Sequence, residues 1–165
     1  METQPVILLA MHGMPASDFP KDQLAEWGRL HSSRAFTDKR YLELDGRLRN
    51  WPRTPENDPY HAASYRLARL MESQTGKKVV VGFNEFDRPS MEDAFADAAR
   101  LGASRVVVIT PMMTRGGSHS ESDIPQAIEK ARKSHPGLSI DYVWPLDESR
   151  IAEFLSGELR PALHP

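Results

Sequence analysis

The sequence predicts a three-layer α/β fold with a four-stranded, mostly parallel sheet in the middle. Four short apolar runs rich in Val and Ile predict the strands: Val6–Met11, Lys78–Asn84, Arg105–Pro111 and Leu138–Trp144. They lack strict polar–apolar alternation, which is typical of strands covered on both faces. Helical patterns separate the runs, which favours right-handed crossovers and the economical strand order 2-1-3-4. This arrangement is one flavodoxin-like half.

Composition bounds what else the chain can be. Its 165 residues, 39% hydrophobic and 27% charged, predict a single domain spanning 1–165. A domain of this size buries roughly 70% of its unfolded surface, so it needs no metal or disulfide to hold its core. The net charge of −2, with no cluster of Lys and Arg, argues against nucleic acid as a partner. The chain has no cysteine, so only His and carboxylate side chains remain as metal ligands.

The first residues give no sign of a targeting segment. The start of the chain is acidic, and the apolar run Val6–Met11 is too short for a secretory signal or a membrane span. We therefore expect a cytoplasmic protein that has no membrane partner.

A long interval after the first strand interrupts the alternation of strands and helices. A structureless loop from about 16 to 58 would be unusual in a compact domain, so we expect helices within it. Apolar side chains recur at helical spacing from about Asp38 to Asn50, and a weaker stripe stands upstream. The two stripes are Tyr41, Leu44, Leu48 and Trp51, then Leu24, Trp27 and His31. The interval at about 16–58 is therefore predicted to be a helical insertion.

Capping residues predict the bounds of the two helices on either side of the second strand. Asp58-Pro59 is typical of an N-cap and first turn, and Gly76 stands where that helix should end. Ser90 with Asp93 indicates a capping box at the start of a helix over Met91–Leu101.

Two further helices are predicted after the third and fourth strands. Asp123 is expected to be the N-cap of the first, and capping alone accounts for its residue type. Asp147 is expected to begin the second, which has one apolar face. That face consists of Ile151, Phe154, Leu155 and Leu159.

Chemistry-bearing side chains follow three neighbouring strands. In open parallel sheets, ligands bind outside the carboxyl ends of the strands, where the strand order reverses. His12 follows the first strand, Glu85 the second, and His119 stands in a glycine-containing loop after the third. Two imidazoles and a carboxylate suit a borderline divalent ion such as iron, cobalt, nickel or zinc. Fewer than four protein ligands leave room for Lewis-acid catalysis or for handing the metal onward.

Structural roles compete with this interpretation. Each of these histidines could simply cap its loop, and Glu85 could be a solvated turn residue. Their shared position at one sheet edge favours a common site. For His31 and His61 we expect packing or surface roles, and for His135 and His164 structural ones.

Three segments together resemble the CbiX/SirB group of class II tetrapyrrole chelatases, the sirohydrochlorin chelatase family. They are His12-Gly13, the segment 82–90 and the segment 117–125. The resemblance covers residues 5–15 and about 58–160, and it implies a chelatase-like fold. The chain departs from the family at Met14-Pro15, where Ser is more frequent, and in its long insertion. These departures affect the expected substrate more than the expected fold.

The resemblance implies a lyase that inserts cobalt or iron, with nickel as a third option, into sirohydrochlorin or a related tetrapyrrole. No organic cofactor or ATP is implied. In such an enzyme His12 and His119 would bind the metal and assist proton removal, with Glu85 as a catalytic carboxylate or third ligand.

Residues near these loops are candidates to bind the macrocycle. Arg88 and Arg115 can pair with substrate carboxylates, although ordinary surface placement explains them equally well. Gly13 and Gly117 lie in the same loops and are further candidates for substrate binding.

The predicted fold also bears on assembly. Four strands make half of a double-domain chelatase, and short family members pair two halves, so the resemblance implies a homodimer around the macrocycle. The main alternative is a non-catalytic tetrapyrrole or metal carrier on the same fold. A hydrolase or transferase that uses His12 is another, and its activity would survive a chelator and the loss of His119.

Overall fold

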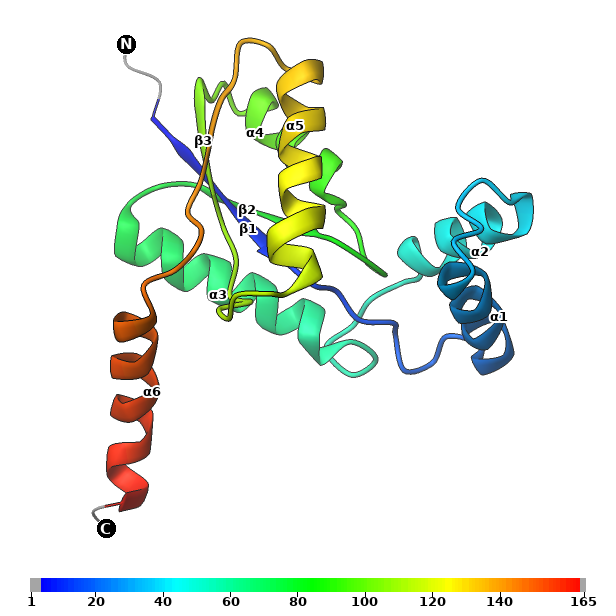
Figure 1. Cartoon of the computed structure of the whole chain (residues 1–165), viewed down its shortest axis with the longest axis horizontal. Coiled ribbons are helices and arrows are strands. Elements are labelled where there is room, and N and C mark those ends of the chain that lie inside the picture. Colours follow the sequence, from blue (N-terminus) through cyan, green and yellow to red (C-terminus); the bar gives the residue numbers. More distant parts are fainter. Residues whose placement is uncertain (1–3, 164–165) are drawn as a thin grey trace.

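The computed structural model describes residues 4–163 and has a four-stranded parallel sheet at its centre (Figure 1). Its strands are β1 (Val6–Met11), β2 (Val79–Phe83), β3 (Arg105–Ile109) and β4 (Ser139–Tyr142), in the order β2-β1-β3-β4. The predicted fold class and strand order are therefore confirmed. The start of the chain, on which the expectation of no targeting segment partly rests, and His164 lie outside the described residues.

Helices cover the two faces of the sheet unequally. On one face α4 (Met91–Arg100) and α5 (Ile124–Ser134) pack over the strands and enclose the larger core, which includes Leu8 and Ala10 of β1. On the other face α3 (Pro59–Thr75) packs against β2 and encloses a smaller core with Leu9 of β1. Successive residues of β1 thus face opposite cores, which explains its continuous apolar sequence.

The capping predictions hold for three helices and fail for a fourth. Asp147 accepts hydrogen bonds from the Ser149 and Arg150 backbones at the start of the helix over Glu148–Leu163. Ser90 and Asp93 form the capping box of α4, and the Asp58 carboxylate accepts a hydrogen bond from the His61 backbone at the start of α3. Asp123 caps nothing, because a π-helical turn over His119–Asp123 runs directly into α5. Its carboxylate is therefore available for another partner.

The insertion consists of two helices, α1 (Lys21–Ser32) and α2 (Lys39–Arg49), which pack against each other beyond the carboxyl end of β1 (Figure 1). The insertion has its own apolar cluster, and Phe86, from the loop after β2, packs against that cluster. Its buried members are Phe19, Trp27, Tyr41, Leu44 and Leu48. This cluster fixes the insertion next to the edge of the sheet where the predicted site lies.

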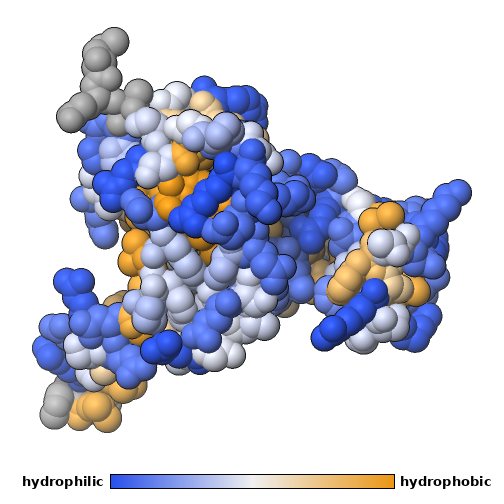
Figure 2. Space-filling model, turned by 45° about the horizontal axis from the view of Figure 1, so that its top comes forward, coloured by the Kyte–Doolittle hydropathy of each residue, from blue (hydrophilic) through white to orange (hydrophobic). Residues whose placement is uncertain are grey.

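The last helix, α6 (Glu148–Leu163), extends away from the sheet, and none of its described residues is buried (Figure 1). Phe154, Leu155 and Leu159 are each more than half exposed. Figure 2 shows hydrophobic surface on this helix, at the lower left. Among residues 4–163, no helix has the length and apolar character needed to cross a membrane.

Candidate metal site

Side chains from three loops converge at the carboxyl edge of the sheet. His12 follows β1, Glu85 follows β2, and His119 opens the π-helical turn after β3. One ligand atom from each residue lies within 4.8 Å of the other two, and all three side chains are partly buried. The two imidazole rings meet edge to face, with centroids 4.5 Å apart. The structure therefore brings together the three residues that the sequence singles out for metal chemistry.

Strand pairing continues past the strands and sets the position of Glu85. Met11 of β1 pairs with Phe83 of β2. Beyond this pair, the Asn84 backbone donates to the Met11 carbonyl at 2.9 Å, and the Glu85 backbone donates to the His12 carbonyl at 2.9 Å. The first two loops thus leave the sheet side by side, which is why residues 73 positions apart in sequence share one site.

A backbone carbonyl orients the His12 ring. Its Nδ1 lies 2.6 Å from the Gly13 carbonyl oxygen, which can only accept a hydrogen bond. Nδ1 therefore carries the proton and donates it, and the lone pair of Nε2 is left for a metal ion or a proton. The His12 backbone N–H donates to the Tyr60 hydroxyl at 3.2 Å, and burial raises the pKa of that hydroxyl.

A carboxylate orients the His119 ring in the same way. Its Nδ1 donates to Asp123 Oδ2 at 2.6 Å, one helical turn along the chain. A carboxylate behind a histidine fixes the tautomer and raises the basicity of the other ring nitrogen, an arrangement common among metal-binding histidines. The partner of the Asp123 carboxylate is thus His119 and not the backbone of α5, which corrects the prediction of an N-cap.

Gly13 is required by a close approach between the first two loops. Its φ is +94°, and a Cβ at this position would lie 1.9 Å from the Glu85 carbonyl oxygen. Gly117 has a milder constraint, since an added Cβ would lie 3.1 Å from Ser120 Oγ. Both glycines therefore have a structural reason of their own, and contact with substrate stays a prediction for each.

The insertion contributes one side chain to the site. His31 of α1 places Nε2 3.6 Å from Glu85 Oε1, while its Nδ1 lies 3.1 Å from the Tyr41 hydroxyl. Its ring stacks on Trp27 at a centroid distance of 4.6 Å. His31 thus has the expected packing role and, in addition, a contact with Glu85 that no local sequence signal indicates. His61 lies elsewhere, stacked on Phe83, and burial lowers its pKa.

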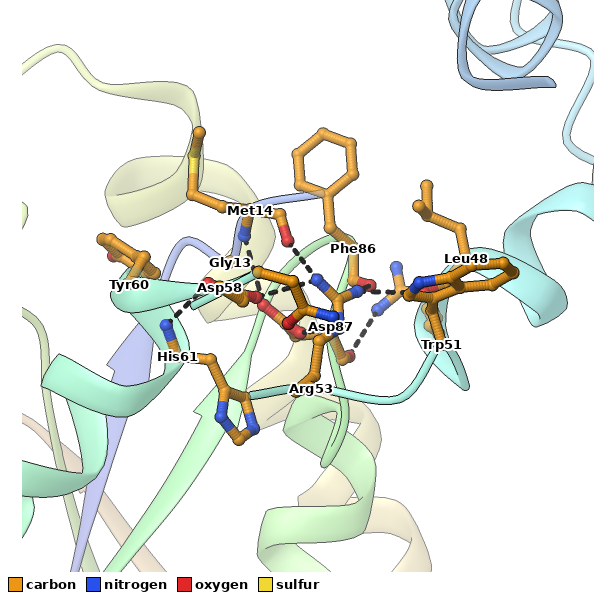
Figure 3. Close-up of polar contacts among 12 residues, drawn as sticks. Gly13, Met14, Leu48, Trp51, Arg53, Asp58, Tyr60, His61, Phe86 and Asp87 are labelled. Carbon is orange, nitrogen blue, oxygen red and sulfur yellow. Dashed lines mark hydrogen bonds and ion pairs between the residues drawn. The ribbon is translucent and has the colours of Figure 1, made fainter. Parts of the chain in front are cut away.

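A buried ion network lies behind the site (Figure 3). Arg53 Nη1 donates to Asp58 Oδ2 at 2.7 Å, and its Nε lies 3.0 Å from Asp87 Oδ1. The three side chains are 7%, 1% and 0% exposed. Burial raises the pKa of Asp87 to about 6, against the lowering effects of a Met14 hydrogen bond and of Arg53. Local sequence patterns do not indicate this network, because Asp87 is far along the chain from Arg53 and Asp58.

The two candidate substrate-binding arginines lie at the surface. Arg88 pairs with Asp93 at 3.0 Å and is 53% exposed, and Arg115 lies 3.7 Å from Glu121 and is 65% exposed. Arg88 also lines a cavity of about 360 Å³ beside the loop after β2, together with Arg49 and Asn84. Both arginines are therefore accessible to an anionic ligand, and their pairing with a substrate stays a prediction.

The profile of the CbiX family matches residues 54–159, which include Glu85 and His119. Over 86 residues the chain is 31% identical to a sirohydrochlorin cobaltochelatase of Sulfurisphaera tokodaii, which covers 52% of this chain and 68% of that relative. Over 81 residues it is 33% identical to a chloroplastic sirohydrochlorin ferrochelatase of Arabidopsis thaliana, which covers 48% of this chain and 36% of the plant protein.

A solved structure has a similar fold over the whole chain. A cobalamin (vitamin B12) biosynthesis CbiX protein from Marinobacter aquaeolei VT8 superposes with a TM-score of 0.51 at 16% identity, covering 97% of this chain and 98% of the other. The family profile spans more than half of the chain and includes two of the three converging residues. The chain therefore belongs to the CbiX family, as its sequence motifs predict.

Proposed function

We propose that this protein inserts a divalent metal ion, cobalt or iron, into sirohydrochlorin or a related tetrapyrrole. The observation that carries the proposal is the convergence of His12, Glu85 and His119 within 4.8 Å, with Nδ1 of each imidazole hydrogen-bonded to a carbonyl or carboxylate oxygen and Nε2 left to bind a metal. The names of the two chelatase relatives support the reaction class. Nickel remains a third candidate, since His and carboxylate ligands accept all three ions. The reaction as proposed needs no organic cofactor.

The geometry suits a metal that is held briefly and then released. The macrocycle loses two pyrrole N–H protons as the dication enters, so its net charge does not change. A loosely held metal and a base must therefore face the same side of the ring. Nε2 of His12 and of His119 can present the ion, and the carboxylate of Glu85 can accept a proton or serve as a third ligand. Three protein ligands leave positions open for the pyrrole nitrogens.

A visible-absorption assay tests the reaction. The protein is mixed with sirohydrochlorin and Co(II) or Fe(II), and the spectrum is followed against the uncatalysed rate. We expect metallation well above that rate with repeated turnovers. A carrier would instead bind macrocycle or metal stoichiometrically without accelerating metallation. A hydrolase or transferase that uses His12 would keep its activity in the presence of a chelator. Comparing the three metals with one macrocycle would identify the preferred ion.

The exposed arginines lead to a prediction about substrate affinity. We expect Arg88→Ala and Arg115→Ala each to raise KM for the tetrapyrrole about 3- to 10-fold with little change in kcat. Each substitution would remove a charge-assisted contact to a substrate carboxylate at the solvent-exposed rim. Steady-state kinetics measure the effect. Arg105→Ala is the matched control, because Arg105 begins β3 at the opposite edge of the sheet. Unchanged KM in both rim variants would remove these residues from the substrate site.

The partner in this proposal is a second copy of the chain, joined through α6. Phe154, Leu155 and Leu159 are 54%, 51% and 54% exposed, although fully burying such side chains is worth roughly 1.5–3 kcal/mol each. An apolar groove of about 430 Å³ lies beside the start of α6, lined by Ile109 and Val143 among others. Ile109 packs toward the α3 side of the sheet, where α3 contacts mainly β2. Reciprocal docking of α6 would bury both surfaces in a symmetric pair.

Light scattering tests the dimer. At micromolar concentration we expect the mass of two chains for the wild type, and the mass of one chain for Leu155→Glu combined with Leu159→Glu, because two buried charges would oppose association. Arg160→Glu changes the charge on the opposite side of α6 and should leave the dimer intact. A monomeric wild type, or a double variant that remains dimeric, would contradict the assignment.

A further inference from the structure

Arg53 lies where the insertion returns to the α/β body, and its guanidinium holds several loops at once (Figure 3). Besides its ion pairs with Asp58 and Asp87, it donates to three backbone carbonyls. These are Met14 O at 2.7 Å, Phe86 O at 2.7 Å and Leu48 O at 2.9 Å. The three carbonyls belong to the loop after β1, the loop after β2 and the end of α2. A single buried side chain thus connects the two loops that carry His12 and Glu85.

The backbone next to Glu85 is strained. The Asp87 N–H donates to the Glu85 carbonyl at 2.7 Å, which closes a γ-turn around Phe86 with a φ of +63°. A γ-turn with positive φ is rare, and a bulky residue in this region costs about 1–3 kcal/mol unless its surroundings hold it there. The Phe86 carbonyl is held by Arg53 Nη2, so the guanidinium stabilises this turn directly.

The same group fastens this turn to the His12 loop. Arg53 Nη1 binds the Met14 carbonyl, and the Asp87 carboxylate that faces Arg53 accepts the Met14 N–H at 3.2 Å. Met14 is two residues from His12, and Asp87 is two residues from Glu85. One guanidinium that lies behind both loops therefore supports the spacing between the imidazole and the carboxylate, together with the backbone bond from Glu85 to His12.

We propose that Arg53 is a positioning residue of the metal site: it holds the strained turn that directs Glu85 toward His12 and His119. The proposal rests on the metal-handling role proposed above, and it assigns a purpose to Arg53, which lies just before the residues that the family profile matches. Arginine suits this position because its planar fork can bind several carbonyls at once, whereas the single ammonium of lysine cannot span them.

Equilibrium titration with Co(II) alone, followed by its visible d–d absorption, tests the role. We expect Arg53→Lys to weaken Co(II) binding about 10-fold, the lower end of what loss of a supporting contact costs a metal site. The absorption spectrum of its cobalt complex should become that of Glu85→Gln, because the carboxylate would no longer reach the ion. In a Glu85→Gln background, Arg53→Lys should cause less than a 2-fold further change.

The difference between the effects of Arg53→Lys with Glu85 and in the Glu85→Gln background separates a positioning role from general support of the fold. A purely structural residue would weaken binding equally in both backgrounds and would leave the spectrum unchanged, and either result would overturn the proposal. Arg47→Lys is the matched control, because Arg47 lies on α2 and contacts Gln23 and the Trp51 ring, away from the site. It should bind Co(II) as the wild type does.

A second variant covers the case in which Arg53→Lys does not fold. Asp87→Asn keeps the guanidinium and its carbonyl contacts but removes the ion pair at 3.0 Å. It should weaken Co(II) binding about 2- to 5-fold with Glu85 present and not measurably in the Glu85→Gln background. Equal effects in the two backgrounds would again reject the role. Because no tetrapyrrole is used, a lack of chelatase turnover would reject the proposed function while leaving this result valid.

Discussion

His12→Ala and His119→Ala should each slow metallation roughly 100-fold or more when the metal is limiting. Each substitution removes one of the two Nε2 atoms that can present the ion or accept a pyrrole proton, and loss of a positioned acid–base group alone typically costs a factor of about 10²–10⁴. The initial rate of sirohydrochlorin metallation, followed by visible absorption at low Co(II), measures the effect.

Two comparisons make this result specific. His135→Ala is the control, because His135 is the C-cap residue after α5 and lies outside the converging group. High Co(II) should restore part of the rate of each variant if metal capture is what the substitution removes. Wild-type rates in both variants at limiting metal would exclude these histidines from the reaction.

Gly13→Ala should destabilise the protein by about 2–4 kcal/mol and abolish most of its metallation activity. At a φ of +94° an alanine is strained, and its Cβ would lie 1.9 Å from the Glu85 carbonyl oxygen, so one of the two loops must move. Either movement separates His12 from Glu85. Urea unfolding gives the loss of stability, and the visible assay gives the loss of activity.

Gly28→Ala provides the matched control for this prediction. Gly28 lies inside α1, and a Cβ there would meet nothing within 4 Å. Alanine at this helical position should leave activity unchanged and stabilise the protein by up to about 1 kcal/mol. A Gly13→Ala variant with wild-type stability and activity would show that the close approach of the two loops is not required.

The strands and the meeting of His12, Glu85 and His119 follow from local signals in the sequence. β1 matches its predicted range of Val6–Met11, because a buried parallel strand is a continuous apolar run. The three side chains come together because each lies in the loop that follows a parallel strand, and all such strand ends meet at one edge of the sheet. Only residue type and chain position are needed for this inference.

Other parts of the site depend on contacts that leave no local trace. The residue type and position of Asp123 predict a cap for α5. Its carboxylate instead binds His119, four residues earlier, because a π-helical turn replaces the expected loop. Arg53 binds backbone carbonyls, which any residue supplies, so the sequence does not identify its partners. His31 reaches Glu85 only because the aromatic cluster of the insertion packs against Phe86.

The sequence does not predict where α6 lies relative to the sheet either. The apolar stripe of α6 correctly predicts a helix with one apolar face, but the same stripe fits a face covered by its own sheet or by a second chain. In the structure that face is open to solvent. The pattern thus predicts an apolar face and does not say what covers it.

A crystal structure of the protein loaded with Co(II), with an anomalous difference map at the cobalt edge, tests the central claim most directly. We predict one cobalt peak bonded to Nε2 of His12 and Nε2 of His119, with the Glu85 carboxylate within reach. A peak bound to only one of these rings, or located away from the carboxyl edge of the sheet, would contradict the account.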